Sequence, residues 1–495
     1  MTKAITRRQL IGTGAAGLCA VALGGKLAAA MGRKRPNVLI ITTDQQRVSA
    51  MSAAGNQWAK TPNMDSIAAQ GVYFMNSYCS YPLCSPSRAS LHTSRMPHEH
   101  GVDHNNMAID PKVPISGQIF QAAGYDTGYA GKWHCPATYP TDGIAGYEVL
   151  NTTTRTGKLA QAVDEATMNA GIAFLRRKHD KPFLAVVSFI NPHDICLPAG
   201  ASSPLLGELW QRYQPPAGAE LPPLPANFGD SEGMASTLAR RPRHDNWDEN
   251  QWRKYTYAYY RMMEDVDKQV GAVLQALRET GQENNTLIIF TSDHGEGLAS
   301  HRWTGKMMYY QEEAAVPLIV SWKGVTPAGR IDREHLVSTL DVLPTICNYA
   351  GIQGPAIMRG TSLRPIIEKP GQPGHEFVVS EMAGGGARSF MVRTKQYKYM
   401  VFPAAGGEKE EMFFDLQADP GEMKNLAAQP ALAPEIERHR KLLADWNQLT
   451  EEADHPILPV PAGQAKRAQK NKGQSQGQNK GKNKGQKKKA KQQNQ

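Results

Sequence analysis

The chain is poor in cysteine and has no long apolar run beyond its first thirty residues. Six cysteines in 495 residues are too few for the disulfide scaffold of a small secreted domain. After residue 30, no apolar stretch is long enough to cross a bilayer as a helix. With 40% hydrophobic and 21% charged residues, the composition is that of a globular protein with room for one large domain and a smaller one.

Acidic residues are missing from both ends of the chain. Residues 466–495 carry a charge of +11 and residues 1–35 carry +7, and neither segment contains an acidic residue. Because the whole chain carries +10, the segment between them carries −8. This distribution argues against specific nucleic-acid binding by a folded basic face. Residues 463–495, without an aromatic side chain, are expected to be a disordered basic tail that binds anionic polymers or surfaces.

The first thirty residues have the parts of an export signal. Arg7 and Arg8 precede a moderately apolar stretch, and Ala28–Ala30 offer a small-residue cleavage site. The paired arginines resemble the twin-arginine type, whose export machinery carries folded proteins. We expect residues 1–30 to be a signal peptide and the protein to be periplasmic or secreted. The alternative is a basic start followed by one membrane anchor.

Strand-like apolar runs alternate with helical patterns over residues 36–370. The runs lie at 37–44, 182–194, 285–296 and 316–322, and apolar spacings of three and four predict a long helix at about 247–280. Continuous apolar strands are typical of a parallel sheet covered on both faces, so the pattern predicts an α/β fold with a mostly parallel central sheet between helices. Residues 375–455 predict a smaller C-terminal subdomain with an antiparallel sheet and a helix at about 432–450.

Polar side chains follow three of the predicted strands. Asp44, His193 and Asp293 each come directly after an apolar run. Because the carboxyl ends of parallel strands meet at one edge of a sheet, we expect these side chains to share a crevice there. Residues 195–246, rich in Pro and Gly, are predicted to form a long excursion over that edge and to shape the cleft.

The segment CSPSR at 84–88, followed by Leu91, Thr93 and Arg95, carries a family resemblance. It resembles the signature of the type I sulfatases, within the alkaline-phosphatase-like superfamily, and the resemblance extends from about residue 36 to about 430. It implies an alkaline-phosphatase-like fold, hydrolysis of sulfate esters, and oxidation of Cys84 to formylglycine by a separate maturation enzyme. The hydrated aldehyde is then the nucleophile. The family usually has glycine where Ser94 stands.

The same resemblance implies a divalent metal. Its ligands would be Asp44, Gln45, the formylglycine made from Cys84, Asp293 and His294. Hard oxygen ligands suit Ca²⁺, and the imidazole leaves Mn²⁺ as an alternative. Many family members have Asp in place of Gln45 and Asn in place of His294, so this site has one negative charge fewer.

The remaining implied site residues are basic. The segment GKWH supplies Lys132 and His134, which leave an extended segment on the same side. By resemblance, Lys132 binds sulfate oxygens and His134 takes a proton from the diol. His193 lies near the leaving oxygen, and Lys306 binds sulfate and helps to protonate the leaving group. Arg88 is implied to hold the diol.

Two further clusters have alternative interpretations. Cys135 and Cys196 each lie beside a site motif, so they are the preferred disulfide pair, with buried free thiols as the alternative. His98, His100 and His104 suggest a metal cluster, but the stretch also matches a family loop near the cleft, where His104 or Asn105 would touch substrate.

The sequence therefore predicts an exported sulfatase acting on a sulfated carbohydrate. The alternatives are an aryl or alkyl sulfatase of broad specificity, and a phosphonate monoester or phosphodiester hydrolase of the same superfamily. The Lys132–His134 pair argues against the hydrolase of phosphonates, which lacks it. A non-catalytic polyanion-binding protein using the basic tail is the third alternative.

Overall fold

The structure is a computed structural model, and it describes residues 35–137, 143–151, 157–199, 203–229, 244, 246–384 and 387–451. The predicted signal peptide, the basic tail and parts of the excursion at 195–246 lie outside these residues. As far as Asn447, the described residues form one compact unit. Within the described ranges, none of the helices has the length and apolar character needed to span a bilayer.

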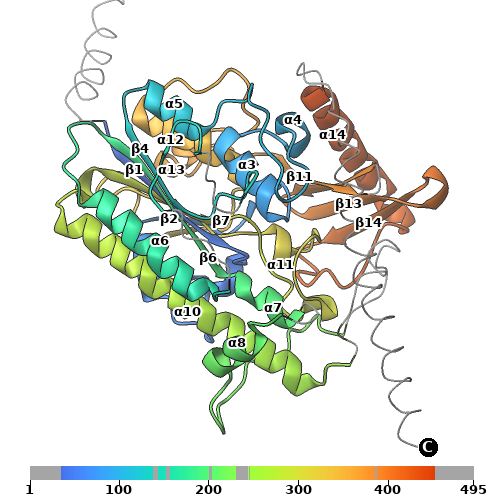
Figure 1. Ribbon diagram of the computed structural model, residues 1–495. Helices are drawn as coiled ribbons and strands as arrows, with labels where there is room; N and C mark the ends of the chain where they lie inside the picture. The colour runs from blue at the N-terminus through green and yellow to red at the C-terminus, as the bar shows by residue number, and fades with distance from the viewer. Residues whose placement is uncertain are drawn as a thin grey trace, which may run out of the picture. The chain divides into compact units, whose positions relative to one another are not determined.

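An eight-stranded sheet lies at the centre of this unit, with the order β5-β4-β6-β1-β7-β8-β2-β9 (Figure 1). Its strands are β1 (Asn37–Asp44), β2 (Gly71–Phe74), β4 (Asp126–Gly131), β5 (Glu148–Val149), β6 (Phe183–Pro192), β7 (Thr286–Ser292), β8 (Leu318–Ser321) and β9 (Arg330–Asp332). The five strands from β5 to β7 are parallel, which confirms the predicted sheet. However, β8 is antiparallel to both β7 and β2, so the prediction of a parallel strand at 316–322 was wrong. The apolar residues of β8 indicate that the strand is buried on both faces, but burial does not determine strand direction.

Helices cover both faces of the sheet because β1 is apolar on both sides. Val38 and Ile40 join a core with α3 (Cys84–Thr93), α5 (Ser116–Ala122) and α12 (Val342–Ala350). Leu39 and Ile41 join a second core with α2 (Pro62–Ala69), α6 (Ala160–Leu175) and α10 (Glu249–Glu279). In Figure 1, α6 and α10 run side by side across their face of the sheet. The predicted long helix is α10, whose first turn is capped by the Asp248 side chain.

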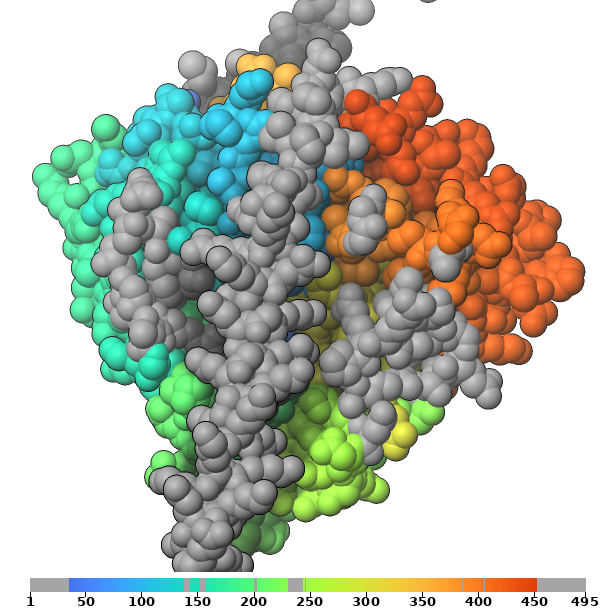
Figure 2. All heavy atoms as spheres, turned by 45° about the vertical axis from the view of Figure 1, so that its right-hand side comes forward, coloured from blue at the N-terminus to red at the C-terminus, as the bar shows by residue number. Residues whose placement is uncertain are grey.

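A four-stranded antiparallel sheet follows, as predicted. Its strands are β11 (Phe377–Gly384), β12 (Ala387–Thr394), β13 (Tyr397–Pro403) and β14 (Lys409–Asp415), and α14 (Ala433–Glu451) follows them. In Figure 2 the orange surface of this sheet adjoins the blue surface of the segment after α4 (Pro97–His100). Arg388 Nη1 donates to Asp103 Oδ1 there at 3.0 Å.

Short elements complete the described chain. A two-stranded parallel pair consists of β3 (Ser77–Tyr78) and β10 (Val337–Ser338). The shorter helices are α7 (Cys196–Ala199), α8 (Leu206–Tyr213), α11 (Gln311–Ala314) and α13 (Arg364–Glu368). Single 3₁₀ turns are η1 (Val48–Ala50), η2 (Ser52–Ala54), η3 (His193–Ile195), η4 (Glu283–Asn285), η5 (Ser300–Arg302), η6 (Thr339–Asp341), η7 (Ala405–Gly407) and η8 (Pro430–Leu432).

Candidate active site

The carboxyl ends of three adjacent strands bring the predicted polar residues together. β1 ends at Asp44, and His193 and Asp293 directly follow β6 and β7, its two neighbours. Asp44 Oδ1 lies 3.9 Å from His193 Nε2 and 3.9 Å from His294 Nε2. The side chains predicted from the strand endings to lie together are therefore adjacent at this edge.

Cys84 enters the same place from the first turn of α3. Its sulfur lies 3.7 Å from Asp44 Oδ1, 3.3 Å from His294 Nε2 and 3.0 Å from Lys306 Nζ. Burial and Asp44 raise the pKa of the thiol, but Lys132 and Lys306 outweigh them and hold this pKa well below its usual range. The site thus stabilises negative charge on the atom that residue 84 presents.

Arg88, one helical turn further on, is hydrogen-bonded to two carboxylates of the site. Its Nε donates to Asp293 Oδ2 at 2.9 Å, and one terminal nitrogen donates to Asp44 Oδ2 at 2.8 Å. The other terminal nitrogen donates to the Lys132 carbonyl and to Ser188 Oγ. The resemblance assigned Arg88 to the diol, whereas the hydrogen bonds of its guanidinium are with the carboxylates, the Lys132 carbonyl and Ser188.

Four buried residues form a group that fits a cation. Ligand atoms of Asp44, Cys84, Asp293 and His294 all lie within 4.8 Å of one another. Arg88 occupies the Oδ2 atoms of both carboxylates, while Oδ1 of each faces His294 Nε2. His294 Nδ1 lies 2.8 Å from the Gly295 carbonyl, so Nδ1 carries the proton and the Nε2 lone pair points into the group. Burial, with the nearby Asp44 carboxylate, raises the pKa of Asp293 to about 6.

Gln45 contributes an amide beside this group. Its Oε1 accepts from Lys306 Nζ at 3.0 Å, and its Nε2 donates to Glu296 and lies 3.1 Å from Cys196 Sγ. A backbone φ of 72° at Gln45 turns the chain sharply after β1. The predicted ligand is therefore adjacent to the group, with its oxygen engaged by Lys306.

Lys132, His134 and His193 lie beside the same group. Lys132 Nζ lies 2.7 Å from Asp44 Oδ2. Burial lowers the pKa of His134. Burial, with Lys132 and Lys306, lowers the pKa of His193 to about 3. Both imidazoles are consequently neutral at pH 7, so each has a ring nitrogen that can accept a hydrogen bond.

Two other sequence predictions have different outcomes. Cys135 and Cys196 are free thiols, and the predicted disulfide was wrong: Cys135 Sγ lies 3.3 Å from the Ser85 carbonyl, while Cys196 Sγ contacts Gln45. Proximity to a motif in sequence did not fix where either sulfur points. His98 binds Glu381 and His100 binds Ser90. Across the described residues, the group around Cys84 is the one metal-type cluster, so the histidine stretch does not form a second.

Two further residues contact this site: sequence reasoning named Asn105 as a cleft residue and missed Glu296. Asn105 Oδ1 accepts from the Ser85 backbone N–H at 3.0 Å, which places this predicted cleft residue against the start of α3. Glu296 is fully buried beside Gln45, although an acid after a strand reads as a solvated loop residue. Only its position two residues after His294 could have drawn attention to it.

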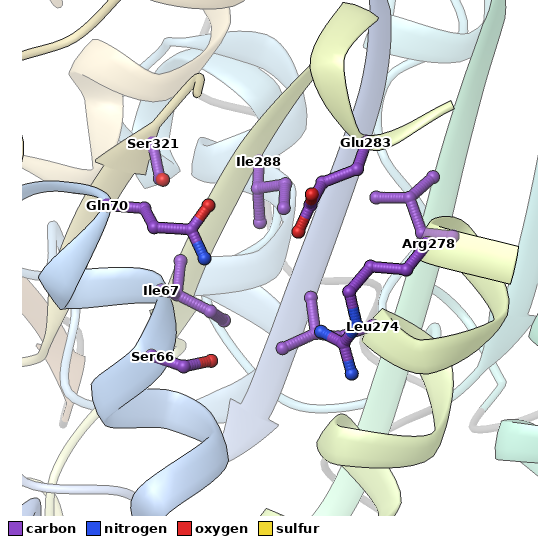
Figure 3. A pocket seen from close by; sticks show the side chains of 9 residues that line it. Ser66, Ile67, Gln70, Leu274, Arg278, Glu283, Ile288 and Ser321 are labelled. Atoms are coloured by element: carbon purple, nitrogen blue, oxygen red, sulfur yellow. The ribbon is translucent and has the colours of Figure 1, made fainter. Parts of the chain in front are cut away.

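A separate pocket lies between α2, the end of α10 and the sheet, away from this edge. Figure 3 shows Ile288 of β7 and Glu283, which precedes that strand, among its lining side chains, with Leu274 and Arg278 from the end of α10. Since β7 delivers Asp293 at its other end, the pocket belongs to the amino ends of the strands and takes no part in the site.

Comparison with known proteins matches this geometry to one family. A family model described as Sulfatase matches residues 36–352, and a second, N-sulphoglucosamine sulphohydrolase, C-terminal, matches residues 299–449. The chain is 32% identical over 449 residues to the Delta 4,5-hexuronate-2-O-sulfatase of Bacteroides thetaiotaomicron, which covers 85% of this chain and 90% of that protein.

Solved structures share the fold. A 2-O GAG sulfatase superposes with a TM-score of 0.74 and 30% identity, covering 87% of this chain and 95% of its own. The phosphonate monoester hydrolase of Agrobacterium radiobacter superposes with a TM-score of 0.71 over 84% of this chain and 96% of its own. At 24% identity, the second likeness shows the fold alone.

Proposed function

Because this chain belongs to the type I sulfatase family and is a sulfuric ester hydrolase, we propose that its substrate is a sulfated carbohydrate. The main structural support for this activity is that Lys306, His294 and Asp44 all contact Cys84. The carbohydrate assignment is supported by the hexuronate-2-O-sulfatase and the 2-O GAG sulfatase, which cover most of this chain.

We propose that Cys84 is oxidised to formylglycine, so its sulfur marks the place of the hydrate oxygens. One hydroxyl of the hydrate loses its proton and attacks the ester sulfur, and the bond from sulfur to the alcohol oxygen breaks. The second hydroxyl then loses its proton, the bond from carbon to the sulfated oxygen breaks, and sulfate leaves as the aldehyde re-forms. Water restores the hydrate. A serine at this position would stop at the sulfate ester.

The proton transfers follow from charge. Lys306, whose ammonium lies 3.0 Å from Cys84 Sγ, binds sulfate and protonates the leaving alcohol. His134, with its lowered pKa, is unprotonated and takes the proton of the second hydroxyl. Lys132 binds sulfate oxygens, and neutral His193 hydrogen-bonds near the leaving oxygen. Arg88 keeps Asp44 and Asp293 ionised and in place.

The residues that would hold a divalent cation are Asp44, Asp293, His294, Gln45 and the modified residue 84. When bound, the cation neutralises sulfate charge and lowers the pKa of the hydrate. We propose Ca²⁺, because most of these donors are hard oxygens; the His294 imidazole makes Mn²⁺ the second candidate. Calorimetric titration of the metal-free protein distinguishes them: tighter binding of Mn²⁺ than of Ca²⁺ would reverse the assignment.

The substrate proposal is tested with defined sulfated oligosaccharides. We expect sulfate release from one or a few of them to exceed, in kcat/KM, release from 4-nitrophenyl sulfate. Fast turnover of the aryl ester with no release from any oligosaccharide would favour an aryl sulfatase of broad specificity. Faster turnover of a matched nitrophenyl phosphonate ester would favour the phosphonate hydrolase.

We propose further that residues 1–30 direct export by the twin-arginine route. Since the maturation enzyme of this family acts on unfolded chains and this route carries folded ones, oxidation of Cys84 would precede export. In cells blocked for export, mass spectrometry of the Cys84 peptide should find the aldehyde. An unmodified thiol in the retained protein would contradict this order.

A further inference from the structure

The loop that carries Lys306 has an unusual backbone. Five non-glycine residues around it have positive φ: Leu298 (45°), Ala299 (72°), His301 (51°), Arg302 (52°) and Met307 (75°). The left-handed region costs an ordinary residue about 1–2 kcal/mol, so such a loop keeps its shape only where other contacts hold it. Strain of this kind at a catalytic lysine calls for a specific support.

One buried carboxylate supplies that support. Glu296 Oε1 accepts hydrogen bonds from the backbone N–H of Leu298 at 3.2 Å and of Gly305 at 2.6 Å, and from Tyr255 Oη at 2.7 Å. Leu298 and Gly305 enclose four of these five residues, and the Gly297 N–H also donates to the Gly305 carbonyl at 2.9 Å. The side chain of Glu296 is fully buried. It therefore closes the base of the loop directly before Lys306.

The second oxygen of the same carboxylate reaches Lys306 by another route. Glu296 Oε2 accepts from Gln45 Nε2, and Gln45 Oε1 accepts from Lys306 Nζ at 3.0 Å. An ionised carboxylate only accepts hydrogen bonds, so it fixes which end of the Gln45 amide faces it. The amide oxygen is consequently turned toward the ammonium, which lies 3.0 Å from Cys84 Sγ.

We propose that Glu296 is a positioning residue that aims the Lys306 ammonium at the reacting ester, through the loop base on one side and the Gln45 amide on the other. This inference rests on the proposed function, in which Lys306 protonates the leaving alcohol. Substitution of Glu296 should then lower kcat most for the esters whose leaving alcohol most needs that proton. A merely structural carboxylate would lower activity equally for all leaving groups.

The test compares Glu296→Gln with Lys306→Ala on 4-nitrophenyl sulfate and on an alkyl or sugar sulfate. Glu296→Gln keeps the size but places an amide NH₂ against another donor. We expect kcat to fall about tenfold on the aryl ester and about 10²-fold or more on the poor leaving group. In the Lys306→Ala background, Glu296→Gln should lower kcat by less than about twofold, because the two residues act as one unit.

Glu422→Gln is the matched control, since Glu422 is also a buried carboxylate but pairs with Lys398 at 2.7 Å. It should give no dependence on the leaving group. Equal losses of kcat on both esters in Glu296→Gln, or losses additive with Lys306→Ala, would overturn the inference. If Glu296→Gln does not fold, Glu296→Asp, which keeps the charge but is one methylene shorter, must show the same dependence.

Hydrogen exchange provides a readout that does not depend on activity. Amides of residues 297–307 should exchange faster in Glu296→Gln than in the wild type, and Glu422→Gln should leave their exchange unchanged. Unchanged protection in Glu296→Gln would contradict the proposal that Glu296 holds the base of this loop. A wild-type protein that released no sulfate would instead refute the proposed function. The two failures are thus distinguishable.

Discussion

The ammonium of Lys306 lies 3.0 Å from the sulfur of Cys84, although 222 positions separate them in sequence. On the carboxylate side of the site, Asp44 and Asp293 are tied to Arg88. Residue 84 therefore sits between a cationic side that meets sulfate and a carboxylate side that suits a cation. A sulfuryl group needs both, because negative charge develops on its oxygens while the nucleophile must stay deprotonated.

Replacing Arg88 should destabilise the metal-free protein strongly. Arg88 is 4% exposed and neutralises two carboxylates that are almost fully buried. Arg88→Gln would remove the guanidinium from Asp293 and leave Asp44 with Lys132 as its remaining cationic partner, so we expect the free energy of unfolding to fall by about 3–5 kcal/mol.

Urea unfolding of the chelator-treated protein measures this loss. Saturating Ca²⁺ should recover part of it, because the cation takes over the neutralisation. Arg364→Gln, at an exposed ion pair with Glu368, is the control and should change stability by less than about 1 kcal/mol. Equal effects of the two variants would contradict the role of Arg88.

Ser94, where the family usually has glycine, should be the more stable choice in this chain. Its φ of 56° is left-handed, so glycine would relieve about 1 kcal/mol. However, Ser94 Oγ donates to the Leu340 carbonyl at 2.8 Å and accepts from the Gly360 N–H at 3.1 Å. Losing both hydrogen bonds inside the protein costs about 2 kcal/mol or more. Ser94→Gly should thus be destabilised by about 1–2 kcal/mol.

Thermal unfolding of Ser94→Ala separates the two contributions. Alanine loses the hydroxyl and keeps the backbone strain, so it should be less stable than Ser94→Gly by about 1 kcal/mol. A Ser94→Gly variant more stable than the wild type would mean that the two hydrogen bonds contribute little.

The pair of His375 and Asp341 should make stability depend on pH. Burial lowers the pKa of His375, but Asp341, 2.9 Å away, outweighs burial and raises it above the ordinary value. A raised folded-state pKa gives stability that is complete below the unfolded pKa of about 6.5 and is lost as pH rises through the folded pKa.

Urea unfolding at about pH 5.5 and 8.5 tests this sign. The wild type should lose more stability between the two than His375→Asn, in which the titrating group is absent. An identical pH response of the two proteins would show that the pair contributes nothing to it.

The sequence anticipated the parts of the site that follow local rules. A strand-like run ending in a polar residue predicted Asp44, His193 and Asp293 at one edge, and a contiguous motif indicated Cys84. The partners of Arg88 and Glu296 lie more than 200 residues away in sequence for their longest contacts, so only tertiary packing joins them. The predictions of a parallel β8 and of a disulfide at Cys135 were wrong for the same reason. Burial and neighbourhood in sequence do not specify orientation.

The most direct test of formylglycine at residue 84 compares sulfate release by the wild type and by Cys84→Ala. Both proteins are coexpressed with the maturation enzyme and assayed on the same sulfate ester. Cys84→Ala retains the small buried side chain but has no group that can become the aldehyde. We expect turnover by the wild type and a loss of at least about 10³-fold in Cys84→Ala, with an unchanged unfolding midpoint. Undiminished sulfate release by Cys84→Ala would contradict it.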